Sequence, residues 1–396
     1  MGIIGCLLGF LIVIIFCYKD WSVYIATIVG AAVVMLFNWL PFIDTLTGAF
    51  IDGMFVPIKS FFFILLFGNI QAKIYSVSGA AYAIADTIMS SLLKPGASNT
   101  RKNVIAISVL LVIGIVLCMG GINASVFIVL MYPIALTIFE HCDIPKRFIL
   151  GVLGACSYTF TLTMPGSPQV TNVAAMSALG TSAGVAAVPG LVGAAVEIVV
   201  IIVLLNIFIN KARARGEHFE LHPLDPHYDE NSPRPKFIVA ILPLIILFIL
   251  FNVVGVDINI CIIISVVVSI ALFWNQLKDS SIRELLSTGA AESIHMSMTV
   301  AAICGFAGVV TNTEAFTSML NAIVSIDMSP MLICAIVVAV MCMLTGGSST
   351  GQLISLPLIA PKLMELGLSA GAIHRIGCFA ATTLDSLPYS GAILML

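Results

Sequence analysis

Neutral polar side chains cluster at four points where long apolar segments are interrupted by glycine or proline. Inside a membrane, such interruptions free backbone amides, which attract anions, and carbonyls, which attract cations. Neutral donors at opposed helix ends fit a small hydroxylated carboxylate better than a cation or a lipid. The candidate substrate-binding residues are Asn123, Ser125, Thr161, Thr163, Gly166, Ser167, Gln169, Asn172, Gly347, Ser348, Ser349, Thr350, Ser386 and Ser390. The alternative, that glycine and proline here only allow close helix packing, stays open.

Two carboxylates in apolar surroundings are the candidates for proton coupling. Asp385 is the only acid at any of the interruptions, and an acid at membrane depth is a functional candidate because it costs about 2.5–3.5 kcal/mol to insert. It could carry a proton, help to hold a cation, or only cap the helix that resumes behind it. Glu197 lies inside an apolar segment and is either a second proton carrier or a buried acid bonded to a neighbouring helix.

The sequence carries no pattern of an enzyme, a metal centre or a nucleotide-driven pump. The HExxH, GxSxG and P-loop motifs are absent, and the longest loop, roughly residues 211–236, is too short for a nucleotide-binding domain. Cys142 stands beside His141 and Asp143, but one Cys-His pair lacks the ligands that a tetrahedral metal ion needs. The other cysteines lie in apolar runs and are interpreted as small apolar fillers. We expect no enzyme activity, no metal and no cofactor, so an ion gradient must supply any driving force.

The composition indicates what must position these residues. Apolar residues make up 60% of the 396-residue chain and charged residues 9%, whereas soluble domains have about 45–50% and 25%. This predicts an integral membrane protein, and a net charge of -3 gives no field that would attract nucleic acid. Seven segments approach the length of about 20 apolar residues that crosses a bilayer, namely residues 2–17, 21–40, 56–74, 185–210, 237–254, 258–274 and 287–310.

The region between the third and fourth of these segments does not divide into simple membrane spans. Two apolar stretches of about 16 residues are separated by Gly120-Gly121, which predicts a re-entrant hairpin over residues 103–140. Residues 147–180 then begin as a helix and meet a Pro-Gly-Ser-Pro run that starts at Pro165. Because proline removes backbone donors, we expect a broken helix there.

The same order of features returns about 223–237 residues later. A second glycine-interrupted hairpin falls on residues 331–366 and a second broken helix on residues 372–396. We expect two repeats, residues 1–210 and 237–396, joined by a cytoplasmic linker over residues 211–236. Each repeat would cross the membrane five times, with three spans, the broken helix and a final span, whereas the hairpin does not cross. Because five is an odd number, the second repeat must enter the membrane from the opposite face, so the repeats are inverted.

The charges favour an amino terminus outside the cell. With the linker in the cytoplasm, fourteen of the 17 Lys and Arg residues lie inside and only Lys59, Lys362 and Arg375 lie outside, as the positive-inside rule requires. By symmetry, the second repeat lacks roughly 37 residues of its counterpart, and we expect it to be truncated.

At these positions the chain resembles the gluconate permease (GntP) family of the ion transporter superfamily, over nearly its whole length. The resemblance rests on residues 120–124, 160–169 with Asn172, 345–351, 374–375 and 384–388. It implies a proton-coupled importer of gluconate or a related hydroxy or keto acid. The chain departs from the family pattern at residues 389–391 and 347–349, so the resemblance leaves the particular acid open.

Together these features predict an all-helical, multi-pass, inner-membrane secondary transporter that imports a small organic anion with protons by alternating access. We expect the substrate carboxylate near Ser167 and Ser390, with Asp385 coupling the proton. Its hydroxyls are expected against Asn123, Thr163, Ser348 and Ser349. A sodium-coupled symporter of the citrate or hydroxybutyrate type is the nearest alternative, and a channel or a membrane-embedded enzyme is a more distant one. The expected partners are the anion, the coupling ion and the bilayer, a homodimer stays open, and nucleic acid is not expected.

Overall fold

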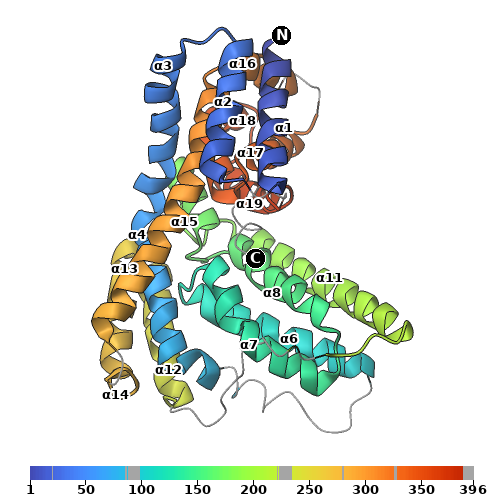
Figure 1. The fold of residues 1–396 in the computed structure, drawn as a ribbon, viewed down its shortest axis with the longest axis vertical. Helices are drawn as coiled ribbons and strands as arrows, with labels where there is room; N and C mark the ends of the chain where they lie inside the picture. The colour runs from blue at the N-terminus through green and yellow to red at the C-terminus, as the bar shows by residue number, and fades with distance from the viewer. Residues whose placement is uncertain are drawn as a thin grey trace. The chain divides into compact units, whose positions relative to one another are not determined.

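The computed structural model describes residues 1–19, 21–84, 87, 99–220, 222, 234–278, 281–324 and 328–386. In these ranges every regular element is a helix (Figure 1). The all-helical fold class expected from the composition is therefore confirmed for this part of the chain.

The expected spans fall on helices with nearby bounds. They correspond to α1 (Gly2–Tyr18), α2 (Val23–Phe37), α4 (Ile51–Val77), α11 (Ala187–Ala214), α12 (Phe237–Ile249) with η3 (Leu250–Val254), α13 (Ile258–Leu272) and α15 (Ile282–Thr311). Among the described residues, five helical runs are long and apolar enough to cross a membrane, namely Phe42–Val77, Asn99–Met119, Ala187–Ala214, Phe237–Val254 and Ile282–Thr311. The first run includes α3 (Phe42–Thr45) and η1 (Leu46–Phe50), which lead into α4.

The first arm of the predicted hairpin is longer than the apolar stretch indicates. Helix α6 covers Asn99–Met119, 21 residues, because the polar residues at its start are also helical. A helix of this length can cross a bilayer, although its apolar part alone is about 16 residues long. The re-entrant course of α6 and α7 (Ala124–Cys142) stays a prediction.

The helices form two compact units, and each unit takes segments from both halves of the sequence. Unit 1 comprises Met1–Leu65, Val170–Ala186 and Glu292–Leu396. Besides α1 and α2 it contains α10 (Val170–Leu179), α16 (Glu314–Val324), α17 (Pro330–Thr345), α18 (Ser348–Glu365) and α19 (Ala370–Ala381). Helices α1 and α2 meet at glycines, since a Cβ on Gly9 would lie 2.9 Å from the carbonyl oxygen of Gly30. The packing units thus differ from the predicted repeats, whose inverted relation stays a prediction.

Unit 2 comprises Leu66–Gln169 and Ala187–Ala291. It contains α6, α7, η2 (Lys146–Phe148), α8 (Ile149–Ser157), α9 (Phe160–Thr163), α11 to α13 and α14 (Trp274–Leu277). Tyr75 anchors its core, because the ring packs edge-on against Phe273 at 5.3 Å and the buried hydroxyl donates to the Ala240 carbonyl at 2.8 Å.

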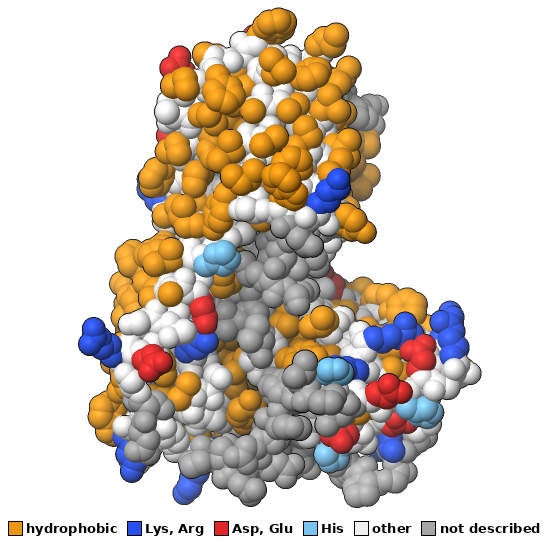
Figure 2. Space-filling view, in the orientation of Figure 1, with side chains coloured by type: hydrophobic (Ala, Val, Ile, Leu, Met, Phe, Trp, Pro, Cys, Tyr) orange, Lys and Arg blue, Asp and Glu red, His pale blue; other side chains and the backbone are white. Residues whose placement is uncertain are grey.

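Several helices present apolar side chains outward, as contact with lipid requires. On α1, Ile3, Leu7 and Leu11 are 46%, 60% and 49% exposed. The face over α1 and α2 that Figure 2 shows is mostly hydrophobic. Because soluble proteins rarely expose contiguous apolar patches of this kind, hydrocarbon chains are the solvent that suits these faces.

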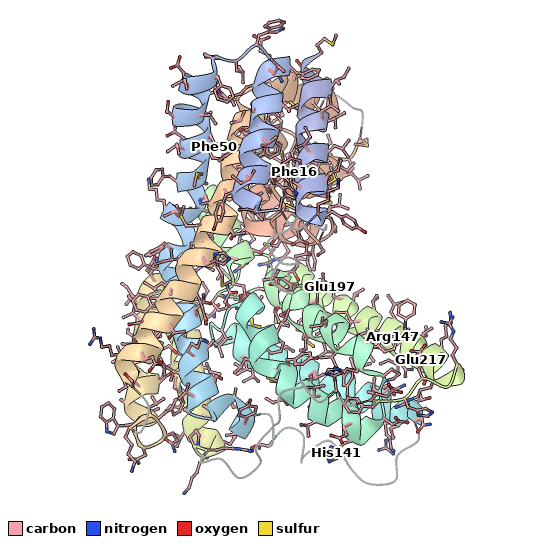
Figure 3. The ribbon with its side chains drawn as sticks, in the orientation of Figure 1. Phe16, Phe50, His141, Arg147, Glu197 and Glu217 are labelled. Atoms are coloured by element: carbon pink, nitrogen blue, oxygen red, sulfur yellow. The ribbon has the colours of Figure 1, made fainter. Side chains whose placement is uncertain are left out.

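Five polar or charged residues join the end of α11 and the segment after it to the loop after α7. This charged corner consists of Asp143, Arg147, Arg213, Glu217 and His218. The Arg213 guanidinium donates to the backbone carbonyls of Cys142 and Asp143, where α7 ends and leaves carbonyls without helical partners. Arg147 forms a two-point ion pair with Glu217, with N–O distances of 2.7 and 2.9 Å (Figure 3). The corner lies outside the candidate membrane-spanning helices except for Arg213 at the end of α11.

Asp143 makes this corner sensitive to acid. Its carboxylate accepts hydrogen bonds from His218 Nδ1 at 2.8 Å and from the Phe219 amide at 3.1 Å. Burial raises the pKa of the Asp143 carboxyl, but the two hydrogen bonds and the charges of His218 and Arg213 outweigh it and hold the pKa below its ordinary value of 3.8. A depressed pKa stabilises the folded corner above the ordinary value, and this stabilisation is lost as the pH falls through the lowered pKa.

We therefore expect acidification below pH 3.8 to speed hydrogen exchange at the Phe219 amide, relative to its intrinsic rate. Hydrogen–deuterium exchange measures this directly. Asp143→Asn should remove most of the pH dependence, because its neutral amide does not titrate. Wild-type protection that is unchanged by acidification would contradict the assignment.

Candidate functional site

The first break comprises residues 164–169, between α9 and α10, and lies in unit 2. Gly166 adopts a φ of +81°, and a Cβ there would lie 2.6 Å from Asn252 Oδ1, so both the backbone and the space favour glycine. The Ser167 hydroxyl donates to the Thr161 carbonyl and accepts the Gln169 amide at 3.2 Å. Backbone groups that the break frees are thereby paired within the break itself.

Gln169 ties this break to the tip of the first hairpin. Its Nε2 donates to the carbonyls of Cys118 and Ile122 at 2.7 and 2.8 Å, and its side chain is buried. The tip turns at Gly121, whose φ is +92°, and Asn123, also buried, follows directly before α7. One neutral amide thus satisfies two carbonyls of a turn inside an apolar unit.

Replacing Gln169 with Leu should destabilise unit 2. The change removes the side-chain donor of the Ile122 carbonyl and leaves the Cys118 carbonyl with only the Gly121 amide, and an unsatisfied buried group costs about 1–3 kcal/mol. Thermal unfolding in detergent measures the loss. Gln276→Leu on α14 is a matched control, since its buried Oε1 accepts no hydrogen bond in the described part of the chain. Equal stability of Gln169→Leu and the control would contradict the proposed tie.

Thr163 and Glu197 also meet in unit 2. The Thr163 hydroxyl, fully buried, donates to Glu197 Oε2 at 2.9 Å, and Glu197 is half-buried on α11 (Figure 3). This contact agrees with the interpretation of Glu197 as an acid bonded to a neighbouring helix. A half-buried carboxylate with one hydroxyl donor can also bind a proton, so its role in coupling stays a prediction.

In unit 1 the tip of the second hairpin packs against the first turn of α10. Helix α18 begins after Gly347 with Ser348, Ser349 and Thr350, all buried. Ser348 Oγ lies 3.0 Å from Thr171 Oγ1 on α10. The second half of the first broken helix therefore lies against the second hairpin, a pairing of segments about 177 residues apart.

Asp385 lies at the same tip. Its carboxylate is 5% exposed, accepts a hydrogen bond from the Ser386 hydroxyl at 3.0 Å and is also hydrogen-bonded to Ser348. The only acid at the interruptions is thus in contact with a predicted substrate-binding serine. Ser390 and the side chain of Ser125 lie outside the described residues.

Asn172 is held by two residues of α19. His374 Nε2 donates to Asn172 Oδ1 at 2.9 Å, because an amide oxygen only accepts, and His374 Nδ1 lies 2.6 Å from the Thr181 hydroxyl. Arg375 donates to Asn172 Oδ1 at 3.5 Å and to the Val185 carbonyl at 3.0 Å, and it is 3% exposed. Helix α19 thus encloses Arg375 inside unit 1, and the expectation that it lies on the outer side of the membrane stays a prediction.

Two buried polar residues on α18 were not among the predicted site residues. Gln352 Oε1 and Ser355 Oγ find no hydrogen-bond partner in the described ranges, although both side chains are at most 1% exposed. Their positions four and seven residues after Ser348 place them on one helical face with it. This spacing, which is that of one helical face, could have indicated both residues from the sequence. Glycine and proline interruptions indicate only the residues at the hairpin tip.

The structure thus gathers the predicted residues into two groups. Unit 2 holds Asn123, Thr161, Thr163, Gly166, Ser167, Gln169 and Glu197, and unit 1 holds Asn172, Gly347, Ser348, Ser349, Thr350, Asp385 and Ser386. A single chamber shared by both groups stays a prediction. Among the described residues no three His, Cys, Asp or Glu side chains converge as metal ligands, and His141 Nδ1 is hydrogen-bonded to the Thr137 carbonyl at 2.9 Å.

The broken helix at Pro165, the interrupted hairpin tips and the lipid-suited outer faces are features of multi-pass membrane transporters. The fold is similar to that in the crystal structure of the YdaH transporter from Alcanivorax borkumensis, with a TM-score of 0.54 and 11% identity over 95% of this chain and 87% of that one. The chain is also 24% identical to the uncharacterized transporter YxjC of Bacillus subtilis (strain 168), over 96% of this chain and 88% of the relative.

The family follows from the sequence match. The chain belongs to the GntP permease family, because the family model described as GntP family permease matches residues 1–259. Family and relatives together identify a transporter, and the family resemblance expected from the sequence motifs is confirmed.

Proposed function

We propose that this permease is a proton-coupled symporter of a small organic anion, such as a gluconate-like hydroxy acid, and that it works by alternating access. The observation that carries the proposal is the first break, where Gly166, Ser167 and Gln169 keep a non-helical backbone paired inside unit 2. Such a break is costly in hydrocarbon and is retained where it serves a polar site.

The anion is proposed to bind at helix ends, against backbone amides and neutral side chains. In unit 2 the donors are those of the break and Asn123, and in unit 1 they are Ser348 and Ser349. Gln352 adds to the unit 1 group an amide oxygen that lacks a partner in the described ranges and could accept a substrate hydroxyl. A hydroxy acid supplies both the carboxylate and the hydroxyls that these groups require.

Protons are proposed to be carried by Asp385, with Glu197 as a second carrier. Each carboxylate accepts hydrogen bonds from hydroxyls, from Ser386 and Thr163 respectively, which can rotate when the acid is protonated. An acid inside a membrane protein can thus change its charge without losing every partner.

A sodium-coupled symporter is the second candidate. The Asp385 carboxylate together with the hydroxyls of Ser348 and Thr171 offers oxygen atoms near one another, which also suits Na⁺. Replacing the sodium gradient at constant pH separates the two functions, because only a sodium symporter loses uptake.

The site of action is proposed to be the cytoplasmic membrane, with the amino terminus outside. The basic residues Lys146, Arg147, Lys211, Arg213 and Arg215 then face the cytoplasm, as the positive-inside rule favours. A homodimer remains compatible with this arrangement.

Uptake by proteoliposomes tests the proposal. With the full chain, an imposed inward proton gradient should drive accumulation of labelled gluconate, hydroxybutyrate or citrate, and a proton ionophore should abolish it. Uptake that needs sodium would favour the second candidate. If no gradient drives uptake of any of the three acids, both candidate functions are contradicted.

A further inference from the structure

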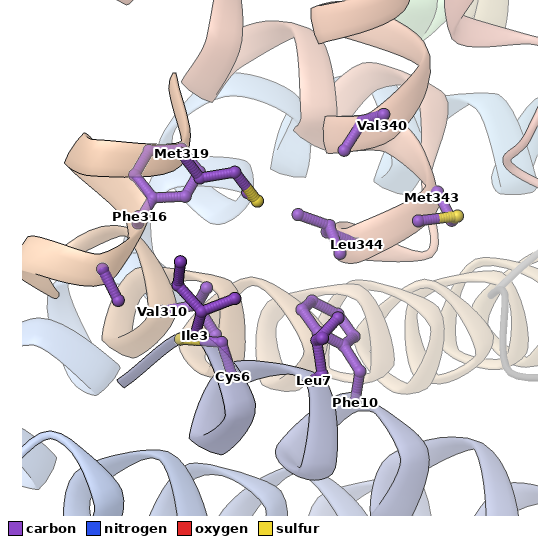
Figure 4. A pocket seen from close by; sticks show the side chains of 11 residues that line it. Ile3, Cys6, Leu7, Phe10, Val310, Phe316, Met319, Val340, Met343 and Leu344 are labelled. Atoms are coloured by element: carbon purple, nitrogen blue, oxygen red, sulfur yellow. The ribbon is translucent and has the colours of Figure 1, made fainter. Parts of the chain in front are cut away.

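An apolar cavity lies inside unit 1 between α1, α15, α16 and α17 (Figure 4). Its volume is about 100 Å³. All eleven lining residues are apolar, and Phe10, Phe316, Met319 and Met343 are among them. None of the predicted substrate or proton residues lines it.

Water is a poor occupant of this cavity. A buried water needs two to four polar partners, and here the only heteroatoms on lining side chains are sulfurs. The thiol of Cys6 is within hydrogen-bonding range of Thr313 Oγ1 at 3.8 Å and Asn38 Nδ2 at 3.9 Å, so it already has polar neighbours. The occupant that fits these walls is hydrocarbon.

The bilayer supplies that hydrocarbon. Ile3 and Leu7 line the cavity and are also 46% and 60% exposed on the outer face of α1, in line with Leu11. The cavity wall is therefore continuous with a lipid-facing surface. The thioether side chains of Met319 and Met343 are flexible and adapt to a chain that has no fixed shape.

We propose that this cavity is a binding site for one acyl chain of a membrane phospholipid, inserted between α1 and α17. Helix α17 is the first arm of the second hairpin and ends at the turn before Ser348. An acyl chain in the cavity supplies the van der Waals contacts that an empty space forfeits, and so supports the packing of this arm against α1 and α16.

Quenching of tryptophan fluorescence by brominated lipid tests the site. In the full chain, with Trp21, Trp39 and Trp274 replaced by Phe, F316W should be quenched in liposomes of phosphatidylcholine brominated on its acyl chain. The quenching should be comparable to that of I4W, whose position is 52% exposed on α1. Strong quenching of I4W without quenching of F316W would overturn the proposal.

Two further substitutions separate lipid in the cavity from lipid around the helix bundle. Ala315→Leu fills the cavity from α16 and should reduce the quenching of F316W, whereas Ala322→Leu, exposed on the same helix, should leave it unchanged. Equal quenching with and without Ala315→Leu would contradict the proposal, because annular lipid alone would then explain the signal.

Cys6 provides a test that does not depend on a tryptophan variant. It is the one half-buried cysteine, since the other nine are buried. In unmodified protein in liposomes, a charged, water-soluble thiol reagent should leave Cys6 unlabelled, whereas the same reagent should label it after unfolding in denaturant. Labelling of the folded protein by the charged reagent would mean a wet cavity and would overturn the proposal.

Discussion

Asp385→Asn should abolish pH-gradient-driven accumulation of the substrate in proteoliposomes while preserving exchange of internal for external anion. Asparagine resembles the protonated carboxyl in shape and keeps an oxygen that can accept from Ser386 and Ser348. Net uptake requires that a proton be bound and released in each cycle, whereas exchange does not. Accumulation should therefore fall to the level of empty liposomes, and exchange should remain.

The controls use the same change at other acids. Glu365→Gln alters an exposed acid that pairs with Lys362 at 3.0 Å, and it should leave both activities intact. Glu197→Gln should lower accumulation less than Asp385→Asn, because Glu197 is proposed as the second carrier. Full pH-driven accumulation by Asp385→Asn would exclude this residue from coupling.

Gly351→Ala should strongly destabilise the second hairpin. A Cβ at Gly351 would lie 2.4 Å from Cys342 Sγ and 2.5 Å from the Cys342 backbone nitrogen, so α17 and α18 must move apart. Overpacking of this kind costs about 1–3 kcal/mol, and a backbone clash cannot be relieved by a new side-chain rotamer. The thermal midpoint of unfolding in detergent should fall, and transport should be lost because Ser348 and Asp385 depend on this hairpin.

Gly154→Ala on α8 is the matched control for that change. No atom lies within 4 Å of a Cβ built at Gly154, and alanine favours a helix over glycine by about 1 kcal/mol. It should leave the thermal midpoint unchanged or raise it. A Gly351→Ala protein as stable as this control would mean that the two hairpin arms are not in close contact.

The interruptions were predictable because their causes are local. Proline removes a donor and glycine allows a positive φ wherever they occur, so the run at Pro165 and the turn at Gly346-Gly347 indicate breaks before any packing is known. The partners of the breaks were not predictable in this way. The carbonyls to which Gln169 donates lie 47 and 51 residues away in the sequence. Every residue has a backbone carbonyl, so the sequence does not indicate which carbonyls a distant side chain will bind.

Arg375 and α6 also show that local composition alone does not predict where a helix begins. The charge count indicates only that Arg375 lies on the outer side, whereas α19, which begins at Ala370, holds it inside unit 1, where the Val185 carbonyl accepts a hydrogen bond from it. In α6, polar residues continue a helix that hydropathy alone would begin later. In both cases the helix boundary depends on tertiary partners, which override local composition.

Accessibility of single cysteines tests most directly whether the two interrupted regions serve one aqueous substrate site. In a chain carrying Cys6→Ser, S167C of unit 2 and S349C of unit 1 should both react with a small water-soluble thiol reagent, and saturating transported anion should slow both reactions. If either position fails to react, or if the anion protects only one of them or neither, the two regions do not serve one aqueous substrate site and the transport mechanism proposed for them is wrong.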